Sequence, residues 1–360
     1  MLIANYVDDF AAVLTKESRE YEWGLLRKRW KFDEPKVSDR FLGVEIYYPD
    51  PNNKRKMVLH QAEYLNKVVQ RYEEATKHTL PPSRVHLPLD EPDWPAEGEG
   101  SNSPTHVKSA IGGIAYAARG TRPDLIKAFH TLARRSTKWS DEGRKFLEAV
   151  LSYCKSHLKE GLLLDATGQS TSVADWQVDT SVDASHDVPW CQTGFFVTLT
   201  PRTHEPGTMV PPFLPIDWVS NGQNYTKLAP AESETVALVQ ATRGGMKYRF
   251  SWDDVTASAD PIKMVVRVDN SQAQLYVERG WSPTMVHVPR VYGVNVLWIT
   301  ERLREGLLTV IHEDGKWMIA DPLTKMRNSE QLMERKVMTS IPDVQVSAVL
   351  TEPNAGSPSP

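Results

Sequence analysis

Cysteine is scarce in this chain, which has only Cys154 and Cys191 among its 360 residues. Two cysteines cannot form a disulfide framework or a zinc site built from cysteine pairs. Long apolar runs are absent too, because no stretch reaches the roughly 18 residues that a membrane-spanning helix needs. The first residues also lack the basic segment and apolar core of a signal peptide. These absences predict an intracellular protein that is not secreted and has no membrane partner.

Excess positive charge is missing as well. The chain has 42 lysines and arginines against 46 aspartates and glutamates, so its formal net charge is −4. Domains that bind nucleic acid through their overall charge are basic, so any such role here must depend on local clusters. Three clusters are candidates, at residues 27–31, 53–56 and 133–139. Each is equally compatible with a solvated helix face or a turn.

Proline and glycine are unevenly distributed and divide the chain. Residues 81–105 are rich in proline, glycine and acids, which is typical of a linker or a long surface loop. Before them, residues 1–80 alternate short β-like runs with helical patterns. After them, residues 106–160 predict two or three helices, and residues 173–325 predict an α/β arrangement. The end of the chain, after about Ile341, predicts disorder.

The α/β part has recognisable strands and helices. Its strands are rich in β-branched and aromatic residues, and its longest helix begins with a proline and acids in the first turn. The expected strands are residues 173–185, 193–200, 216–223, 262–270 and 308–314, and the expected helices are residues 228–250 and 291–307.

Four carboxylates of this part lie in or at the ends of the expected elements. Asp183 lies in a strand, Glu234 on a helix, Asp269 at the end of a strongly apolar strand, and Asp321 at the start of a last helix. An acid at the end of an apolar strand is costly to desolvate, so Asp269 needs a partner or a metal. Phosphodiester hydrolysis by two Mg²⁺ ions needs oxygen ligands that converge from separate elements. The four acids are therefore a candidate metal site, although each one alone is also compatible with a surface cap.

A series of short motifs, in order over roughly residues 2–330, resembles the C-terminal part of copia-type LTR retrotransposon Pol polyproteins. That part comprises the end of the reverse transcriptase and then the RNase H domain. The motifs are YVDDF (6–10), FLGVEI (41–46), LHQAEYLNKVV (59–69), SAIGGIAYAARGTRPDL (109–125), SVDASHDV (181–188), WCQTGFFVTL (190–199), IDWVSNGQ (216–223), LAPAESETVAL (228–238), VDNSQA (268–273) and ADPLTKM (320–326).

The resemblance implies a fold and a domain order. The fold would be α/β (α+β), with a truncated reverse-transcriptase palm and a helical connection followed by an RNase H-like mixed-sheet domain. Residues 1–80 would be the C-terminal remnant of the palm, 81–105 the linker, 106–165 the helical thumb or connection, 166–330 the RNase H-like domain, and 331–360 a largely disordered tail.

The resemblance also implies roles for the four acids. Asp183, Glu234, Asp269 and Asp321 would be the catalytic set of an RNase H that binds Mg²⁺ or Mn²⁺. Glu234 is preferred to Glu232 because the ETVAL sequence matches the family's helix register, and a residue two positions away points elsewhere on a helix. The expected partners are an RNA–DNA hybrid or other nucleic acid and the remainder of the Pol polyprotein. The expected location is the cytoplasm, in a virus-like particle, or the nucleus.

Asp8 and Asp9, in the YVDDF motif, resemble half of a polymerase site. A palm that binds two metals needs a further aspartate on an earlier strand. That strand, with the fingers, would lie before Met1. We therefore expect a fragment of a longer polyprotein in which Asp8 and Asp9 are a metal-binding half-site without polymerase activity of their own.

The truncation, the acidic net charge and the altered segment 287–296 favour the alternative of a catalytically inactive remnant, which would bind nucleic acid or have no function, whereas the presence of all four acids favours the nuclease. The sequence departs from the family pattern at several positions. Ser185 replaces the second aspartate of a DAD strand, a position outside the acid set. Residues 287–296 replace a Lys-His-Ile stretch, and residues 201–215 form a longer hairpin loop than usual. A mobile catalytic histidine has no secure match, since His312 is expected in or at the end of a strand.

Overall fold

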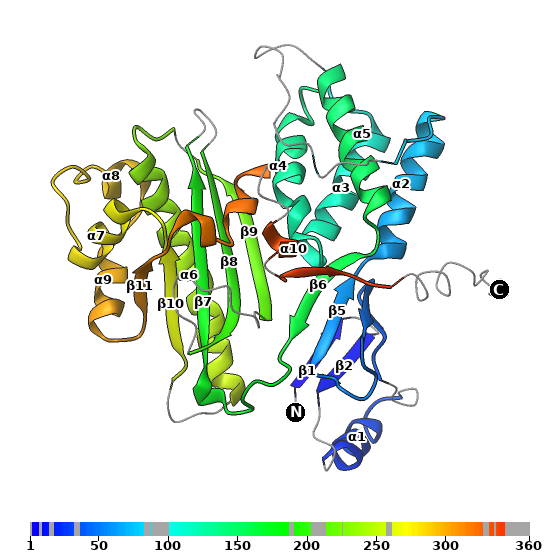
Figure 1. The fold of residues 1–360 in the computed structure, drawn as a ribbon, viewed down its shortest axis with the longest axis horizontal. Coiled ribbons are helices and arrows are strands. Elements are labelled where there is room, and N and C mark those ends of the chain that lie inside the picture. Colours follow the sequence, from blue (N-terminus) through cyan, green and yellow to red (C-terminus); the bar gives the residue numbers. More distant parts are fainter. Residues whose placement is uncertain are drawn as a thin grey trace.

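The computed structural model describes most of the chain as two packed units, each built around a sheet (Figure 1). Among the described residues, no helix is both long and apolar enough to cross a membrane. The structure describes residues 2–6, 9–13, 18–31, 37–82, 87, 101–186, 191–202, 214–224, 226–256, 261–326, 331–334 and 336–342.

The first unit combines an antiparallel sheet with a group of helices (Figure 1). The strand order of the sheet is β12-β6-β5-β4-β3, and each neighbouring pair is antiparallel. A separate hairpin, β1–β2, forms at the N-terminus. The elements are β1 (Leu2–Tyr6), β2 (Asp9–Val13), α1 (Arg19–Arg27), β3 (Arg40–Phe41), β4 (Val44–Tyr47), β5 (Lys56–His60), α2 (Ala62–Thr76), α3 (Thr105–Gly120), η1 (Pro123–Leu125), α4 (Ile126–Arg135), α5 (Asp141–Ser156) and β6 (Glu160–Asp165).

Helices α2 and α3 pack closely because their facing residues differ in size. Val68 of α2 is buried against Gly113 of α3, where an added Cβ would lie 2.6 Å from a Val68 methyl carbon. The neighbouring Gly112 faces open space, and an added Cβ there meets nothing within 4 Å. One glycine of this pair is therefore required by packing and the other is not.

This difference predicts opposite effects for the same substitution at adjacent positions. Gly113→Ala should lower the free energy of unfolding by about 1–3 kcal/mol because it overpacks the helix contact. Gly112→Ala should raise it by up to about 1 kcal/mol because alanine favours the helix. Urea denaturation of the two variants checks this prediction, and equal destabilisation by both would contradict the packing argument.

The second unit is a mixed sheet with the strand order β11-β10-β7-β8-β9. β7, β8 and β9 are antiparallel neighbours, whereas β10 runs parallel to β7 and β11 parallel to β10. The predicted mixed α/β fold, with a mixed sheet in the second half of the chain, is confirmed. The elements are η2 (Val173–Asp175), β7 (Trp176–Ser185), β8 (Gln192–Pro201), β9 (Leu214–Gly222), α6 (Pro230–Thr256), β10 (Lys263–Val268), α7 (Ser271–Arg279), α8 (Val288–Tyr292), α9 (Leu297–Arg304), β11 (Thr309–His312), η3 (Gly315–Trp317) and η4 (Asp321–Leu323).

The two faces of this sheet differ because side chains alternate along β7. Val178 and Val182 point to the face that α6 covers and belong to the apolar core of the second unit. Asp179, Ser181 and Asp183 alternate with them and point to the other face. Segment 313–326, which contains η3 and η4, contacts this second face, since Ser181 Oγ accepts a hydrogen bond from Ala320 N at 3.3 Å.

The helix predicted over residues 291–307 forms as two helices. α8 ends at Tyr292, and α9 begins at Leu297. Gly293 between them has φ +66°, a left-handed conformation that ends a helix. The prediction therefore missed a glycine stop signal.

The last described residues are folded, although they fall in the expected tail of residues 331–360. α10 (Gln331–Glu334) is followed by β12 (Met338–Ser340), which pairs with β6 of the first sheet. Leu332 and Met338 are buried in the core of the first unit. The polar and proline-rich end dominated the sequence signal and obscured this short apolar strand. Residues 343–360 lie outside the described residues.

Candidate metal centre

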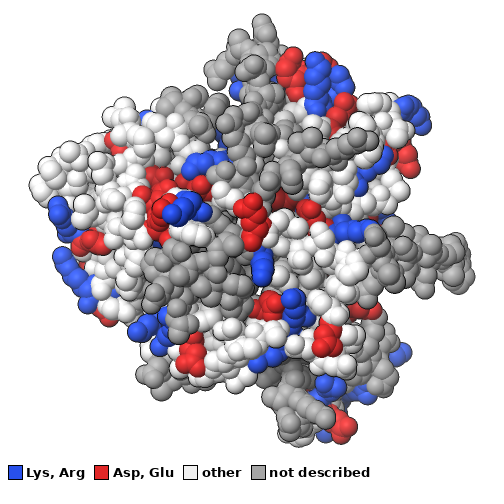
Figure 2. Space-filling model, viewed as in Figure 1, with Lys and Arg blue, Asp and Glu red and all other residues white. Residues whose placement is uncertain are grey.

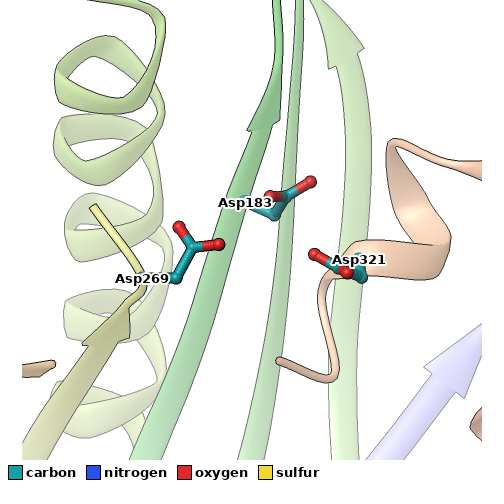
Figure 3. A group of neighbouring side chains, drawn as sticks. All are labelled: Asp183, Asp269 and Asp321. Atoms are coloured by element: carbon teal, nitrogen blue, oxygen red, sulfur yellow. The ribbon is translucent and has the colours of Figure 1, made fainter. Parts of the chain in front are cut away.

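Three of the four predicted acids meet at one end of the mixed sheet. Val182 of β7 pairs with Val268 of β10, so the next residues of these parallel strands, Asp183 and Asp269, lie side by side. Asp321 is the first residue of η4. One carboxylate oxygen of each acid lies within 4.8 Å of those of the other two (Figure 3). Two strands and a turn, far apart in the sequence, therefore converge on one point.

Glu234, the fourth acid, is buried in the first part of α6 and approaches from the covered side of the sheet. Its Oε1 atom accepts a hydrogen bond from the backbone of Ala184 at 3.3 Å. Its Oε2 atom is buried and has no hydrogen-bond partner among the described residues. Burial, followed by the charges of Asp183 and Asp269, raises the pKa of Glu234 to about 9. Glu234 is thus electrostatically part of the same acid cluster.

Three acids of the cluster, Asp183, Glu234 and Asp269, have raised pKa values because they are buried close to other carboxylates. Burial raises the pKa of Asp183 to about 7, and the neighbouring Asp321 adds to the shift. Burial also raises the pKa of Asp269. Acids that resist ionisation at neutral pH are characteristic of functional sites, and a bound cation would favour their charged forms.

Two residues of the same turn contact the cluster, and the sequence analysis assigned no role to either. Lys325 Nζ lies 3.1 Å from Asp183 Oδ1 and 3.1 Å from Asp321 Oδ1. The hydroxyl of Thr324 donates a hydrogen bond to Asp183 Oδ2. Burial lowers the pKa of Lys325, but the charges of Asp183 and Asp321 outweigh it and raise that pKa overall. The sequence feature that could have revealed the role of Lys325 is its spacing of four residues from Asp321, which places both residues in one turn.

The donors of the cluster fit a hard divalent cation. All are carboxylate oxygens, which Mg²⁺ and Mn²⁺ prefer over softer ligands. The partnerless Oε2 of Glu234 is a buried acceptor that a cation would satisfy. Among the described residues, Asp183, Asp269 and Asp321 are the group of acids, histidines and cysteines whose geometry suits a metal ion.

Comparison with known proteins supports the resemblance seen in the motifs. No family model matches the chain. The chain is 23% identical over 344 residues to the "Retrovirus-related Pol polyprotein from transposon TNT 1-94" of Nicotiana tabacum, and the match covers 94% of the chain. The resemblance to retrotransposon Pol polyproteins is confirmed. The chain spans about a quarter, 24%, of the length of this Pol relative.

A solved structure, RNase H1 from the halophilic archaeon Halobacterium salinarum NRC-1, is also similar to the chain. The alignment covers 44% of this chain and 98% of the archaeal one, at 13% identity and with a TM-score of 0.28.

The YVDDF motif, residues 6–10, lies far from the acid cluster in the sequence, and the structure describes only part of it. Asp8 lies outside the described residues, and Asp9 is the first residue of β2. The strands on either side of residues 7–8 are antiparallel, since β1 and β2 pair from Tyr6–Asp9 to Leu2–Val13. The metal-binding role of Asp8 and Asp9 stays a prediction.

Glu232 points away from the acid cluster, as the helix register predicted. It accepts hydrogen bonds from Tyr292 Oη at 2.5 Å, from His287 Nε2 at 2.8 Å and from the backbone of Leu228 at 3.0 Å. Burial raises its pKa, but these hydrogen bonds outweigh burial and hold the pKa below its usual range. Segment 287–296, which departs from the family pattern, is therefore hydrogen-bonded to the start of α6.

His312 is the last residue of β11, at the strand end that the sequence predicted. It pairs with Val268, the residue before Asp269, and its Nδ1 atom lies 3.5 Å from Ser271 Oγ. His312 therefore borders the acid cluster.

Proposed function

We propose that residues 166–330 form an RNase H-type nuclease that hydrolyses the RNA strand of an RNA–DNA hybrid. Asp183, Glu234, Asp269 and Asp321 would hold Mg²⁺ or Mn²⁺. The observation that carries this proposal is the convergence of three carboxylates from separate elements, with oxygens within 4.8 Å of one another, beside the buried partnerless oxygen of Glu234. The similarity to a Pol polyprotein supports the assignment to a copia-type RNase H.

The residues of the cluster have separable roles in this proposal. Bound divalent cations would stabilise the charge that develops on a phosphodiester and lower the pKa of an attacking water. Asp183 and Asp321 would bind the cations. Thr324 and Lys325 hold these two acids in place. The side chain of Lys325 is 44% exposed, so its ammonium group can reorient when a cation or a phosphate enters. Burial of Asp183 excludes bulk water from one side of the site.

The hybrid would be bound by its shape and its 2′-hydroxyl groups rather than by base sequence. Figure 2 shows lysines and arginines spread among acids over the viewed face, with no single large basic area. Since phosphate contacts dominate nucleic-acid affinity, this face and the net charge of −4 predict weak binding by the chain alone. We therefore propose that the remainder of the Pol polyprotein contributes to binding. Within such a polyprotein the chain would act in the cytoplasm, in a virus-like particle, or in the nucleus.

The test is cleavage of a labelled RNA–DNA hybrid by the full chain with Mg²⁺ or Mn²⁺. We expect cuts in the RNA strand and none in the DNA strand. Asp269→Asn should lower the rate by on the order of 1,000-fold, because it removes a metal ligand. Asp314→Asn is the matched control, since Asp314 is an exposed acid on the same side of the sheet that pairs with Lys316. Equal cleavage by both variants, or none by the folded wild-type chain, would contradict the proposal.

The alternative, a catalytically inactive remnant, is favoured by one observation. Lys325 already places a positive charge between Asp183 and Asp321, where a metal ion would otherwise neutralise them. If this contact persisted, divalent cations would not bind. Titration with Mn²⁺ therefore separates the two functions, because a remnant of this kind shows no saturable binding at the site.

A further inference from the structure

The turn that carries Asp321 packs against the first unit as well as against its own sheet. Met318, Ala320 and Leu323 are fully buried, and they belong to an apolar core that joins the helices of the first unit to Phe196 of β8 and Trp218 of β9. The same core includes Ala118 of α3 and Leu132 of α4. The segment that completes the acid cluster therefore packs against α4 and η1 of the first unit as well as against its own sheet.

A chain of buried hydrogen bonds crosses the same boundary. Lys127 Nζ, on α4, donates to Gln192 Oε1, on β8, at 2.8 Å. The Gln192 amide nitrogen donates to Ser220 Oγ, on β9, and the Ser220 hydroxyl donates to the backbone oxygen of Leu323 in η4 at 2.5 Å. The side chains are buried, with Lys127 4%, Gln192 1% and Ser220 1% exposed. Each donor thus points toward η4, and the chain ends two residues from Asp321 and from Lys325.

Strand β8 also contacts the same turn, through its backbone at Gly194. An added Cβ at Gly194 would lie 2.7 Å from Thr324 Cγ2 and 2.9 Å from Leu323 Cβ. The backbone of β8 therefore touches η4 directly, and small displacements of the turn are not absorbed by a flexible side chain. A hydrogen bond at Leu323 acts on a turn that is already seated closely on the sheet.

A buried lysine is a poor way to stabilise an interface, because its desolvation offsets the gain from its hydrogen bonds. Hydrogen-bonded residues behind metal ligands orient those ligands, and their loss weakens metal binding about 10- to 100-fold. We propose that Lys127, Gln192 and Ser220 are positioning residues through which helix α4 sets the place of Asp321 in the acid cluster. This inference rests on the proposed metal site.

The experiment measures Mn²⁺ affinity by calorimetric titration of the full chain and of Lys127→Met, Ser220→Ala and the double variant. Each single variant should bind Mn²⁺ about tenfold more weakly. The double variant should lose little more than either single variant, because both interrupt one chain. Trp218→Phe is the matched control, since it removes another buried hydrogen bond at this boundary, from Trp218 Nε1 to Ala118 O, without touching the chain. Its Mn²⁺ affinity should stay within about twofold of the wild type.

Amide hydrogen exchange of residues 320–326 without metal gives a second readout. Exchange should speed up in Ser220→Ala, which removes only a hydroxyl group, and stay unchanged in Trp218→Phe. Wild-type Mn²⁺ affinity with unchanged exchange in the folded variants would overturn the positioning role, as would losses that multiply in the double variant. Absence of Mn²⁺ binding by the wild type would instead remove the metal site, while the exchange result would still decide whether α4 positions the turn.

Discussion

Replacing Glu234 with glutamine should stabilise the metal-free protein and, in the same molecule, lower hybrid cleavage by on the order of 100-fold. The stabilisation follows from the pKa of Glu234, which burial and two neighbouring aspartates raise from 4.5 to about 9. A raised pKa means that the folded state resists ionisation. The stability of the fold with a protonated Glu234 is fully present below pH 4.5, and it is lost as the pH rises toward 9. At pH 7 the penalty is about 3 kcal/mol, since each pH unit contributes about 1.4 kcal/mol.

Glu232→Gln is the matched control, because it makes the same change two residues earlier on the same helix. The pKa of Glu232 is held below its usual range by hydrogen bonds from Tyr292, Leu228 and His287. Its contribution is therefore present above pH 4.5 and is lost as the pH falls. Urea denaturation at pH 5 and pH 8, with EDTA, should show stabilisation at pH 8 for Glu234→Gln and destabilisation for Glu232→Gln. Destabilisation of both variants at pH 8 would contradict the electrostatic account.

The four acids could be predicted because each marks an element that the sequence shows by local pattern. Asp183 lies in a strand and Asp269 directly after one, both strands contain several β-branched residues, and parallel strands bring their ends to one edge of a sheet. Glu234 could be chosen over Glu232 because ETVAL matches the helix register of the family that the chain resembles, and helix geometry separates residues two positions apart. Asp321 lies where the sequence predicts the start of a helix, but that element is only a single turn, η4, Asp321–Leu323.

The parts that could not be predicted depend on contacts between distant segments. β12 pairs with β6, and a three-residue strand has no periodicity from which to find such a partner. Lys127 lies within an ordinary helical pattern, and only the packing of α4 on β9, the neighbour of β8, brings its ammonium group to Gln192. Lys325 lies in the ADPLTKM motif, in which the sequence indicates a role only for Asp321. Local patterns thus identify the four acids, whereas the groups that hold these acids in place come from tertiary structure.

Replacing Arg122 with methionine should lower the free energy of unfolding by about 3–5 kcal/mol, the largest stability effect that we expect from a single substitution in this chain. Arg122 belongs to the TRPD sequence and is fully buried. It donates to both oxygens of Asp124, at 2.9 Å and 2.6 Å, and to the backbone oxygen of His157 at 2.8 Å. Tyr153 donates to Asp124 as well, at 2.9 Å. Methionine would leave the buried Asp124 carboxylate without its counterion.

Arg144→Met on α5 is the control for this prediction. Arg144 pairs with Glu148 at 2.9 Å, but its side chain is 44% exposed, so water replaces the lost contact. Its effect should be less than a quarter of that of Arg122→Met in the same urea titration. The double variant Arg122→Met/Asp124→Asn should recover part of the loss, because it also removes the unpaired charge. Equal losses in the two arginine variants would show that the TRPD sequence is kept for something other than this buried ion pair.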